Sequence, residues 1–233
     1  MQRTKIEWVV NADGSRAFTW NPIVGCTGGC WYCYARRLHE RFHGKGSFVA
    51  QLVPEGLHDP TKRKRPATIF VGSMTDIGRP DMLPQWVRAV SSVMVEASWH
   101  RYLLLSKRPL GYADIAALAA RQGWWCGATV DSAWYDRSVA DLLALSIPNV
   151  YLSFEPLLGR VGDIALAALR RGKVRWAILG ACTGPGAFMP PREQVEEIME
   201  ACRVGGVPVF VKDNLVKGYP DLAQYRAIPY LEA

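Results

Sequence analysis

Short apolar runs recur along the chain, and each is followed by a longer segment in which apolar residues repeat at helical spacing. The short runs are rich in β-branched and aromatic residues, which is typical of strands buried on both faces. Seven strands are therefore predicted, at Thr19–Val24, Ala67–Ser73, Arg101–Ser106, Trp124–Val130, Val150–Glu155, Trp176–Gly180 and Val207–Lys212.

The segments between these runs have the pattern of helices. In one of them Val87, Val90 and Met94 recur at helical spacing, and another begins after Pro191 and ends before Gly205, as helices commonly do. Six helices are predicted, at Tyr34–Phe42, Leu83–Ala97, Tyr112–Arg121, Ala133–Leu145, Ile164–Arg171 and Arg192–Arg203, while Val53–Pro66 is expected to be an irregular loop.

Alternation of strands and helices at this spacing favours βα units and a parallel sheet. With no linker in the sequence, we expect one α/β domain over residues 1–233. Its sheet is either doubly wound or a complete or partial (β/α) TIM-like barrel, between which periodicity alone does not choose.

Composition and charge restrict the class of protein and its expected partners. The 233 residues are 49% hydrophobic and 21% charged, which is ordinary for a soluble globular protein. No run of 18 uncharged apolar residues and no signal peptide is found, so we expect a cytoplasmic protein without a membrane partner. The net charge of +7 favours a polyanionic partner such as nucleic acid, although a basic solvated surface explains it equally simply.

The six cysteines are unevenly placed. Cys26, Cys30 and Cys33 lie in the loop 25–35, between the first predicted strand and helix, with the spacing C-x3-C-x2-C. Gly28 and Gly29 allow tight backbone curvature there, so that three thiolates can converge. Cysteine thiolates hold iron–sulfur clusters, and three of them on a four-iron cubane leave one iron open to a small molecule.

Other interpretations of the cysteines remain. His39, with His43 one turn on, could complete a structural Cys3His zinc site with the three cysteines. Cys126 and Cys202 are expected to be buried core residues. Cys182 lies at a strand end and is either a small buried side chain or a hydrogen-atom donor in catalysis.

The C-x3-C-x2-C motif, with aromatic Tyr32 before its last cysteine, resembles the signature of the radical S-adenosylmethionine (SAM) superfamily. Further segments resemble a short family that is common in phage genomes and related to spore photoproduct lyase. They are Trp20-Asn21-Pro22, Cys33-Tyr34-Ala35, Ser73-Met74-Thr75-Asp76, Ser106-Lys107-Arg108-Pro109 and Ser153-Phe154-Glu155-Pro156-Leu157-Leu158. Gly180-Ala181-Cys182-Thr183-Gly184 departs from the Gly-Gly-Glu-Ser-Gly expected in that family.

This resemblance implies a cofactor and a reaction. The open iron of a [4Fe–4S] cluster would bind the amino and carboxylate groups of SAM, with Tyr32 against the adenine. The reduced cluster would cleave SAM to a 5′-deoxyadenosyl radical, which abstracts hydrogen from the substrate. An external electron donor such as flavodoxin or ferredoxin is expected, and a phage-encoded protein would work in the cytoplasm of the bacterial host.

Polar residues follow nearly every predicted strand, at the edge where parallel α/β barrels carry their sites. By charge, Lys107 or Arg108 could pair with the carboxylate of SAM, and Ser73, Asp76 or Glu155 could bind its amino group or ribose. A surface turn at Arg108-Pro109 and a solvated acid at Glu155 are the structural alternatives. The cofactor candidates are Tyr32, Ser73, Asp76, Lys107, Arg108, Ser153 and Glu155, and the substrate candidates are Thr129, Asp131, Lys212, Asp213 and Asn214.

A nucleic-acid base is the substrate that the resemblance favours, through a rearrangement or repair of a modified thymine in DNA. Lys62-Arg63-Lys64-Arg65 could join Arg36, Arg37 and Arg41 in one phosphate-binding face, unless these charges are merely solvated. The side chains that could stack on bases, or else lie in the core, are Trp31, Trp124, Trp125 and Trp134. The alternatives are a radical SAM enzyme for a peptide or small metabolite, and a non-catalytic zinc-stabilised nucleic-acid-binding protein.

Overall fold

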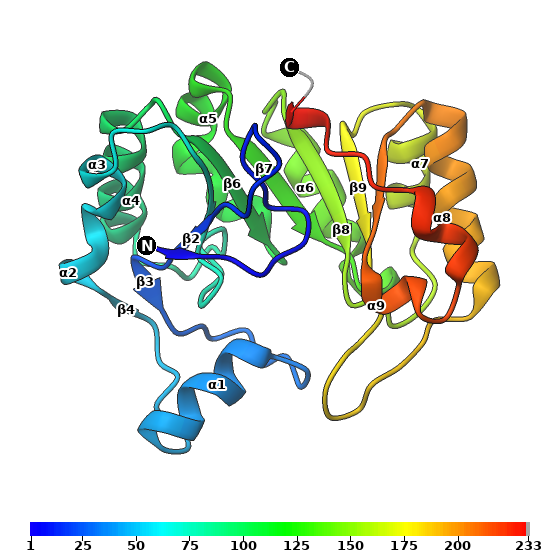
Figure 1. Cartoon of the computed structure of the whole chain (residues 1–233), viewed down its shortest axis with the longest axis horizontal. Coiled ribbons are helices and arrows are strands. Elements are labelled where there is room, and N and C mark those ends of the chain that lie inside the picture. Colours follow the sequence, from blue (N-terminus) through cyan, green and yellow to red (C-terminus); the bar gives the residue numbers. More distant parts are fainter. Residues whose placement is uncertain (232–233) are drawn as a thin grey trace.

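The computed structural model describes residues 1–231 and is organised around a mostly parallel sheet (Figure 1). The sheet has eight strands in the order β1-β2-β5-β6-β7-β8-β9-β10, and only the pairing of β1 with β2 is antiparallel. Its strands are β1 (Gln2–Arg3), β2 (Phe18–Trp20), β5 (Thr68–Val71), β6 (Arg101–Ser106), β7 (Trp125–Thr129), β8 (Val150–Phe154), β9 (Trp176–Leu179) and β10 (Val209–Val211). A separate antiparallel pair joins β3 (Ile23–Val24) to β4 (Gln51–Leu52).

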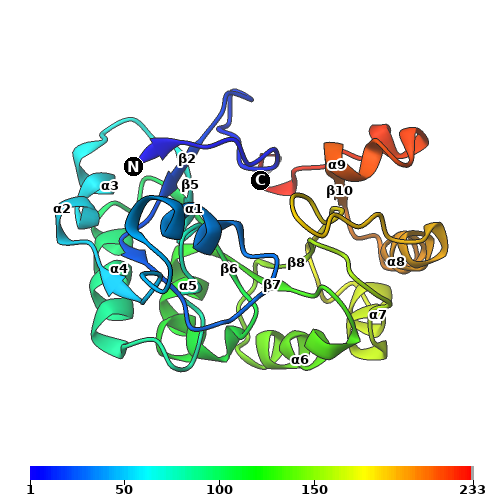
Figure 2. The ribbon, with the colours of Figure 1, turned by 90° about the horizontal axis from the view of Figure 1, so that it is seen from below.

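Helices cover the convex face of this sheet. Seen from below, α4 to α8 form an arc around its outside (Figure 2). The α-helices are α1 (Tyr34–His43), α2 (Pro54–Leu57), α3 (Asp59–Lys62), α4 (Pro84–Glu96), α5 (Ala116–Gln122), α6 (Asp136–Ala144), α7 (Asp163–Arg170), α8 (Arg192–Gly205) and α9 (Asp213–Val216). The 3-10 helices are Pro109–Ile115, Ala133–Tyr135, Pro220–Gln224 and Pro229–Leu231.

Each predicted strand and helix has a counterpart, most with shifted ends, and the helix predicted at Tyr112–Arg121 is 3-10 up to Ile115 and α-helical from Ala116. Two further expectations are corrected. The strand expected at Thr19–Val24 is divided into β2 and β3, because Pro22 has no N–H to donate to a sheet ladder. The segment Val53–Pro66, expected to be irregular, forms the short helices α2 and α3, which carry Pro54 and Pro60 in their first turns, where proline is well tolerated.

The parallel α/β prediction is confirmed, but the ring of a complete barrel is not formed in the described residues. β1 and β10 stand at opposite ends of the strand order, so the curved sheet is compatible with a partial barrel only. The N-terminal segment crosses its concave face (Figure 1). Tyr230 fixes this segment from the other end of the chain, because its hydroxyl donates to the carbonyl oxygen of Trp8 at 2.6 Å and accepts from the N–H of Val10 at 3.1 Å.

Successive side chains of a strand point to opposite faces of the sheet, so the sheet has one hydrophobic core on each face. On β8, Leu152 and Phe154 belong to the outer core under the helices, whereas Tyr151 belongs to the inner core on the concave side. The next inward position is the small Ser153, which pairs across the ladder with Thr129 of β7. The concave side is therefore filled by large rings at its base and left open at the carboxyl ends of the strands.

No helix in residues 1–231 is both long and apolar enough to span a membrane.

Candidate functional site

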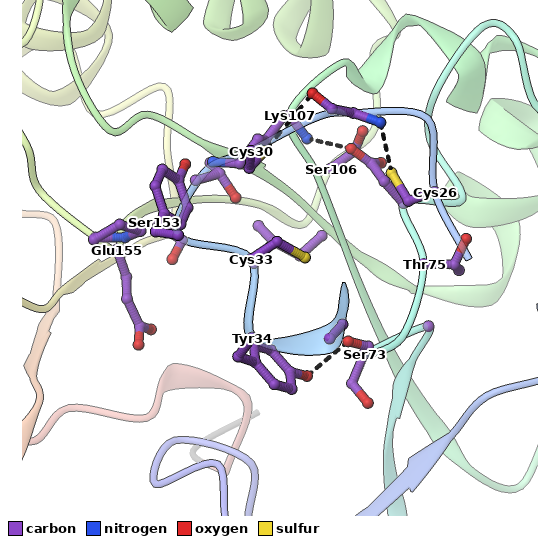
Figure 3. A pocket seen from close by; sticks show the side chains of 18 of the residues that line it. Cys26, Cys30, Cys33, Tyr34, Ser73, Thr75, Ser106, Lys107, Ser153 and Glu155 are labelled. Carbon is purple, nitrogen blue, oxygen red and sulfur yellow. Dashed lines mark hydrogen bonds between the residues drawn. The ribbon is translucent and has the colours of Figure 1, made fainter. Parts of the chain in front are cut away.

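A pocket of about 430 Å³ opens at the carboxyl edge of the sheet. It lies between the cysteine loop and the ends of β5 to β10, as expected of parallel α/β sheets, whose ligands bind beyond the carboxyl ends of the strands. Figure 3 shows residues from this loop and from the ends of β5, β6 and β8 around one space. The sequence-predicted residues that line it are Cys26, Cys30, Tyr32, Cys33, Ser73, Asp76, Lys107, Thr129, Ser153, Glu155, Cys182 and Lys212.

The backbone of the loop orients its sulfur atoms. The Sγ of Cys26 accepts a hydrogen bond from the N–H of Gly28 at 3.2 Å. Cys33 is the N-cap of α1, and its Sγ accepts a hydrogen bond from the N–H of Arg36 at 3.4 Å, so the first turn of the helix fixes the position of this sulfur. Gly29 has a φ of +68°, in the left-handed region that favours glycine, which turns the chain between the first two cysteines.

Neighbouring charges shift the pKa values of Cys26 and Cys30 in opposite directions. Burial raises the pKa of Cys26, and the carboxylate of Asp76 raises it further. Burial also raises the pKa of Cys30, while the ammonium group of Lys107 lowers it. Thiols in this setting hold their protons until a cation displaces them, which is how metal binding at cysteines releases protons.

The three thiols lie close enough to the pocket to be compared with the ligands of the cofactor that the sequence resemblance implies. A Cβ added at Gly28 would lie 3.2 Å from the Sγ of Cys26 and 3.8 Å from that of Cys30, so the missing side chain leaves a small space that two sulfurs border. Cys33 lines the same pocket. The loop therefore brings three cysteines to one pocket, and thiols are the donor type that iron–sulfur clusters use, each bound to a separate iron.

A site for a single metal ion, such as zinc, needs ligands that all converge on one point. Within residues 1–231, no group of three or more His, Cys, Asp or Glu side chains is arranged to hold a single ion. His39, the fourth ligand of the zinc interpretation, instead stacks on His43 with ring centroids 4.4 Å apart and packs against Phe48. The described side chains thus do not assemble the Cys3His zinc site considered from the sequence.

Asp131 ties the cysteine loop to the sheet. This buried carboxylate accepts hydrogen bonds from the hydroxyl of Tyr32 and, at 3.2 Å, from the Nζ of Lys107. The ammonium group of Lys107 also lies 5.0 Å from the ring centroids of Tyr32 and Tyr135. Asp131 does not line the pocket, so its geometry suits a positioning role rather than the substrate contact predicted from the sequence.

Two buried oxygen atoms of the pocket residues have no hydrogen-bond partner within the described chain. The Oδ2 of Asp76 accepts from the backbone N–H of Lys107 at 3.0 Å, but its Oδ1 has no partner, and neither has the Oγ of Ser153. Burial raises the pKa of Asp76. Buried polar groups are nearly always paired in native proteins, so unpaired ones in residues that line a cavity point to a ligand.

Glu155 and Lys212 face each other across the ends of β8 and β10. The two side chains form an ion pair, and the Nζ of Lys212 is also 3.9 Å from a carboxylate oxygen of Glu7. Both line the pocket, where they form a wall with compensated charge. The interpretation of Glu155 as a solvated acid is therefore wrong in one respect, because its charge is paired.

Besides Asp131, three predicted residues lie outside the pocket lining. Arg108 is exposed, which matches the surface-turn alternative. Asp213 is exposed and pairs with Arg226. Asn214 uses its amide on the backbone of Ala181, accepting from its N–H at 3.1 Å and donating to its carbonyl at 2.9 Å, so it fixes the end of β9.

Several lining residues were not predicted. Thr75 and Arg79 come from the loop after β5, where their position beyond a strand end was a usable signal. Ile6, Trp8 and Phe70 form an apolar part of the lining, and nothing local in the sequence places the N-terminal segment at this edge.

Cys182 lines the pocket from the β9–α8 loop. Its backbone pairs with Phe188 in an antiparallel bridge, with N–H to carbonyl distances of 3.1 and 3.2 Å. Burial raises the pKa of the Cys182 thiol, so it is held in the protonated form that carries a transferable hydrogen. Cys126 and Cys202 are buried in the outer core, as predicted.

The basic residues do not form the common face expected from the sequence. Lys62–Arg65 precede β5 and thus lie at the amino edge of the sheet, with Arg63 over the ring of Phe18 and Lys64 over that of Trp99. The arginines of α1 lie beyond the carboxyl edge. Trp124 and Trp125 are core residues, and only Trp31 and Trp134 of the four candidate tryptophans are exposed.

Comparisons with known proteins add a family. The model of a family described as protein of unknown function, DUF5131, matches residues 3–217. No curated protein matches the sequence. Among solved structures, a cysteine-to-serine mutant of spore photoproduct lyase is similar with a TM-score of 0.47 and 9% identity, over 90% of this chain and 74% of that chain.

Proposed function

We propose that this chain, which belongs to the DUF5131 family, is a radical SAM enzyme that acts on a nucleic-acid base. One observation carries the proposal. The three cysteines of the C-x3-C-x2-C loop line the same pocket as Asp76 and Ser153, which each keep a buried polar atom unpaired. A cluster ligand set beside unsatisfied polar groups is what a cofactor and its small-molecule partner require.

In this proposal Cys26, Cys30 and Cys33 hold a [4Fe–4S] cluster, which with SAM supplies a 5′-deoxyadenosyl radical for hydrogen abstraction. The residues of the chain bind and orient. The unpaired Oδ1 of Asp76 accepts a hydrogen bond from the amino group or ribose of SAM, and the Oγ of Ser153 supplies a second contact. Lys107 lies beside Cys30 and offers an ammonium group to the SAM carboxylate.

The substrate would enter from the side of β9 and β10. Lys212 and Cys182 line that part of the wall, and Thr129 lines the pocket at the end of β7. The protonated thiol of Cys182 can return a hydrogen atom to a product radical. A base must leave its stack to reach such a pocket. We propose a modified thymine in DNA as the base, rearranged or repaired, with flavodoxin or ferredoxin as the external electron donor.

The test is anaerobic reconstitution with iron and sulfide. The reduced protein should give a [4Fe–4S] EPR signal that changes when SAM is added, and 5′-deoxyadenosine should form. The variants Cys26→Ala, Cys30→Ala and Cys33→Ala should each lose the signal and the product, because each removes one thiolate donor. Cys202→Ala is the matched control, because this thiol lies in the outer core.

A protein that takes up no cluster would contradict the proposal. So would a cluster whose spectrum ignores SAM, since the site would then lack the open iron. Uptake of one zinc ion instead would leave a structural metal site as the better account.

A further inference from the structure

The outward face of α1 carries a row of exposed apolar side chains. Tyr34, Leu38 and Phe42 are spaced one turn apart, and their exposed fractions are 54%, 47% and 71%. Trp31, just before the helix, is 61% exposed. We call these four residues the α1 ridge. Scattered exposed apolar residues need no explanation, but a contiguous set marks an interaction site.

The ridge leads into the pocket. At one end Tyr34 lines the pocket, and its hydroxyl donates to the carbonyl of Ser73 at 2.6 Å. Trp31 packs against the β9–α8 loop, since a Cβ on Gly186 would lie 2.6 Å from its ring. At the other end, α1 stands apart from the helices that cover the sheet, below its carboxyl edge (Figure 1).

Basic side chains lie along one side of this ridge. By helical rotation Arg37 and Arg41 lie along one side of it, and the guanidinium carbon of Arg41 is 5.9 Å from the centroid of the Phe42 ring. The acid of this helix, Glu40, lies on another face and accepts a hydrogen bond from the N–H of Gly46 at 3.0 Å. Rings beside guanidinium groups suit a partner that is both aromatic and anionic.

The spacing of the ridge side chains indicates whether the partner is a duplex or a single strand. Successive ridge side chains on the helix are four residues, or about 6 Å, apart along its axis, whereas bases in a duplex rise about 3.4 Å each. Bases stacked as in a duplex therefore cannot each meet a ridge side chain, but an unstacked strand can. We propose that the α1 ridge docks a single-stranded nucleic acid, or a strand opened from a duplex, and leads one base into the pocket.

This inference rests on the proposed function for the fate of the base, but docking itself needs no cofactor. The test uses the whole protein and a fluorescein-labelled single-stranded thymidine 12-mer, with affinity measured by anisotropy. Phe42→Ala should weaken binding by roughly 5- to 150-fold, the range for loss of one base–aromatic stack, and Phe42→Trp should retain it. Arg41→Gln should reduce the slope of log affinity against log salt by about 0.7, as expected for one phosphate contact.

The control is Lys64→Gln, from the basic run at the opposite edge of the sheet. It should leave affinity for the 12-mer close to that of the wild type. Melting temperatures of all variants should agree, because Phe42, Arg41 and Lys64 are exposed.

Other results overturn the inference. Equal affinity of Phe42→Ala and wild type would do so, as would a loss confined to Lys64→Gln. Absence of binding, with slower reduction of Phe42→Ala by flavodoxin, would assign the ridge to an acidic protein partner. A wild-type dimer that Phe42→Ala dissociates in sedimentation would assign it to a second copy of the chain.

The two proposals fail separately. Ridge-dependent binding without SAM cleavage would remove the proposed chemistry and keep the docking surface. SAM cleavage without ridge-dependent binding would do the reverse.

Discussion

The two ends of the concave side of the sheet are built from the same strands in different ways. At the base, rings from both chain ends and four strands pack edge to face, as where Trp8 meets Phe70 at 5.3 Å and Trp176 at 5.6 Å between centroids. At the carboxyl edge the inward residues are Thr129 and Ser153, and the loops beyond them carry charges and thiols. One end is closed by packing and the other stays open.

The difference shows how stability and function are divided within one fold. The aromatic base buries large apolar surfaces that stabilise the fold, and its polar atoms are the hydroxyls of Tyr151 and Tyr230 and the indole nitrogens. The open edge keeps a carboxylate oxygen and a hydroxyl unpaired, which costs stability until a ligand arrives. Trp8 belongs to both regions, because it lines the pocket and packs in the base.

The largest expected effect is at the base. Trp176→Ala should lower the free energy of unfolding by about 3–5 kcal/mol, because it leaves a cavity among four aromatic neighbours and frees the carbonyl of Ala227 that the indole N–H contacts. Urea unfolding followed by circular dichroism measures it. Trp134→Ala, which removes a ring that is 87% exposed, should change stability little. Equal losses for the two variants would show that the base is not the tightly packed region.

A smaller loss is expected where the cysteine loop meets the sheet. Tyr32→Phe removes the hydroxyl that donates to buried Asp131, so unfolding free energy should fall by about 1.5–3 kcal/mol, the range for hydrogen bonds to charged groups. Tyr34→Phe loses a bond to the neutral carbonyl of Ser73 and should cost less. If both variants cost the same in denaturant titrations, Asp131 does not anchor the loop.

The smallest expected effect is an increase in stability instead of a loss. Burial raises the pKa of Asp76, so the folded chain holds this proton more tightly than the unfolded chain, and stability falls as pH rises from the ordinary value of 3.8 through the raised pKa. Asp76→Asn should therefore stabilise the cofactor-free protein by about 1 kcal/mol at pH 7, or about 2–4 °C in Tm. The gain should shrink toward pH 4 in calorimetry. A gain that is constant with pH, or a loss at pH 7, would contradict this account of the buried carboxylate.

Local patterns in the sequence sufficed for the elements and for much of the pocket. Runs of β-branched residues located the strands, and Arg101–Ser106 was predicted with its actual bounds. Because the carboxyl ends of parallel strands meet at one edge, Ser73, Lys107 and Ser153 could be grouped from their positions alone. The cysteine spacing identified the loop in the same way, since three thiols within eight residues need no tertiary information to be neighbours.

Tertiary structure decided what local patterns do not encode. The N-terminal segment with Trp8 is held on the concave face by residues far along the chain, among them Trp176 and Tyr230. Asp131, Asn214 and Arg108 looked alike as polar strand ends, yet the fold turns one to the cysteine loop, one to a backbone and one to solvent. The basic run Lys62–Arg65 and the arginines of α1 do not share a face, because they lie at opposite edges of the sheet. The sequence determined which chemistry the chain carries, whereas long-range packing, which depends on residues far apart in the chain, decided which groups meet around the pocket.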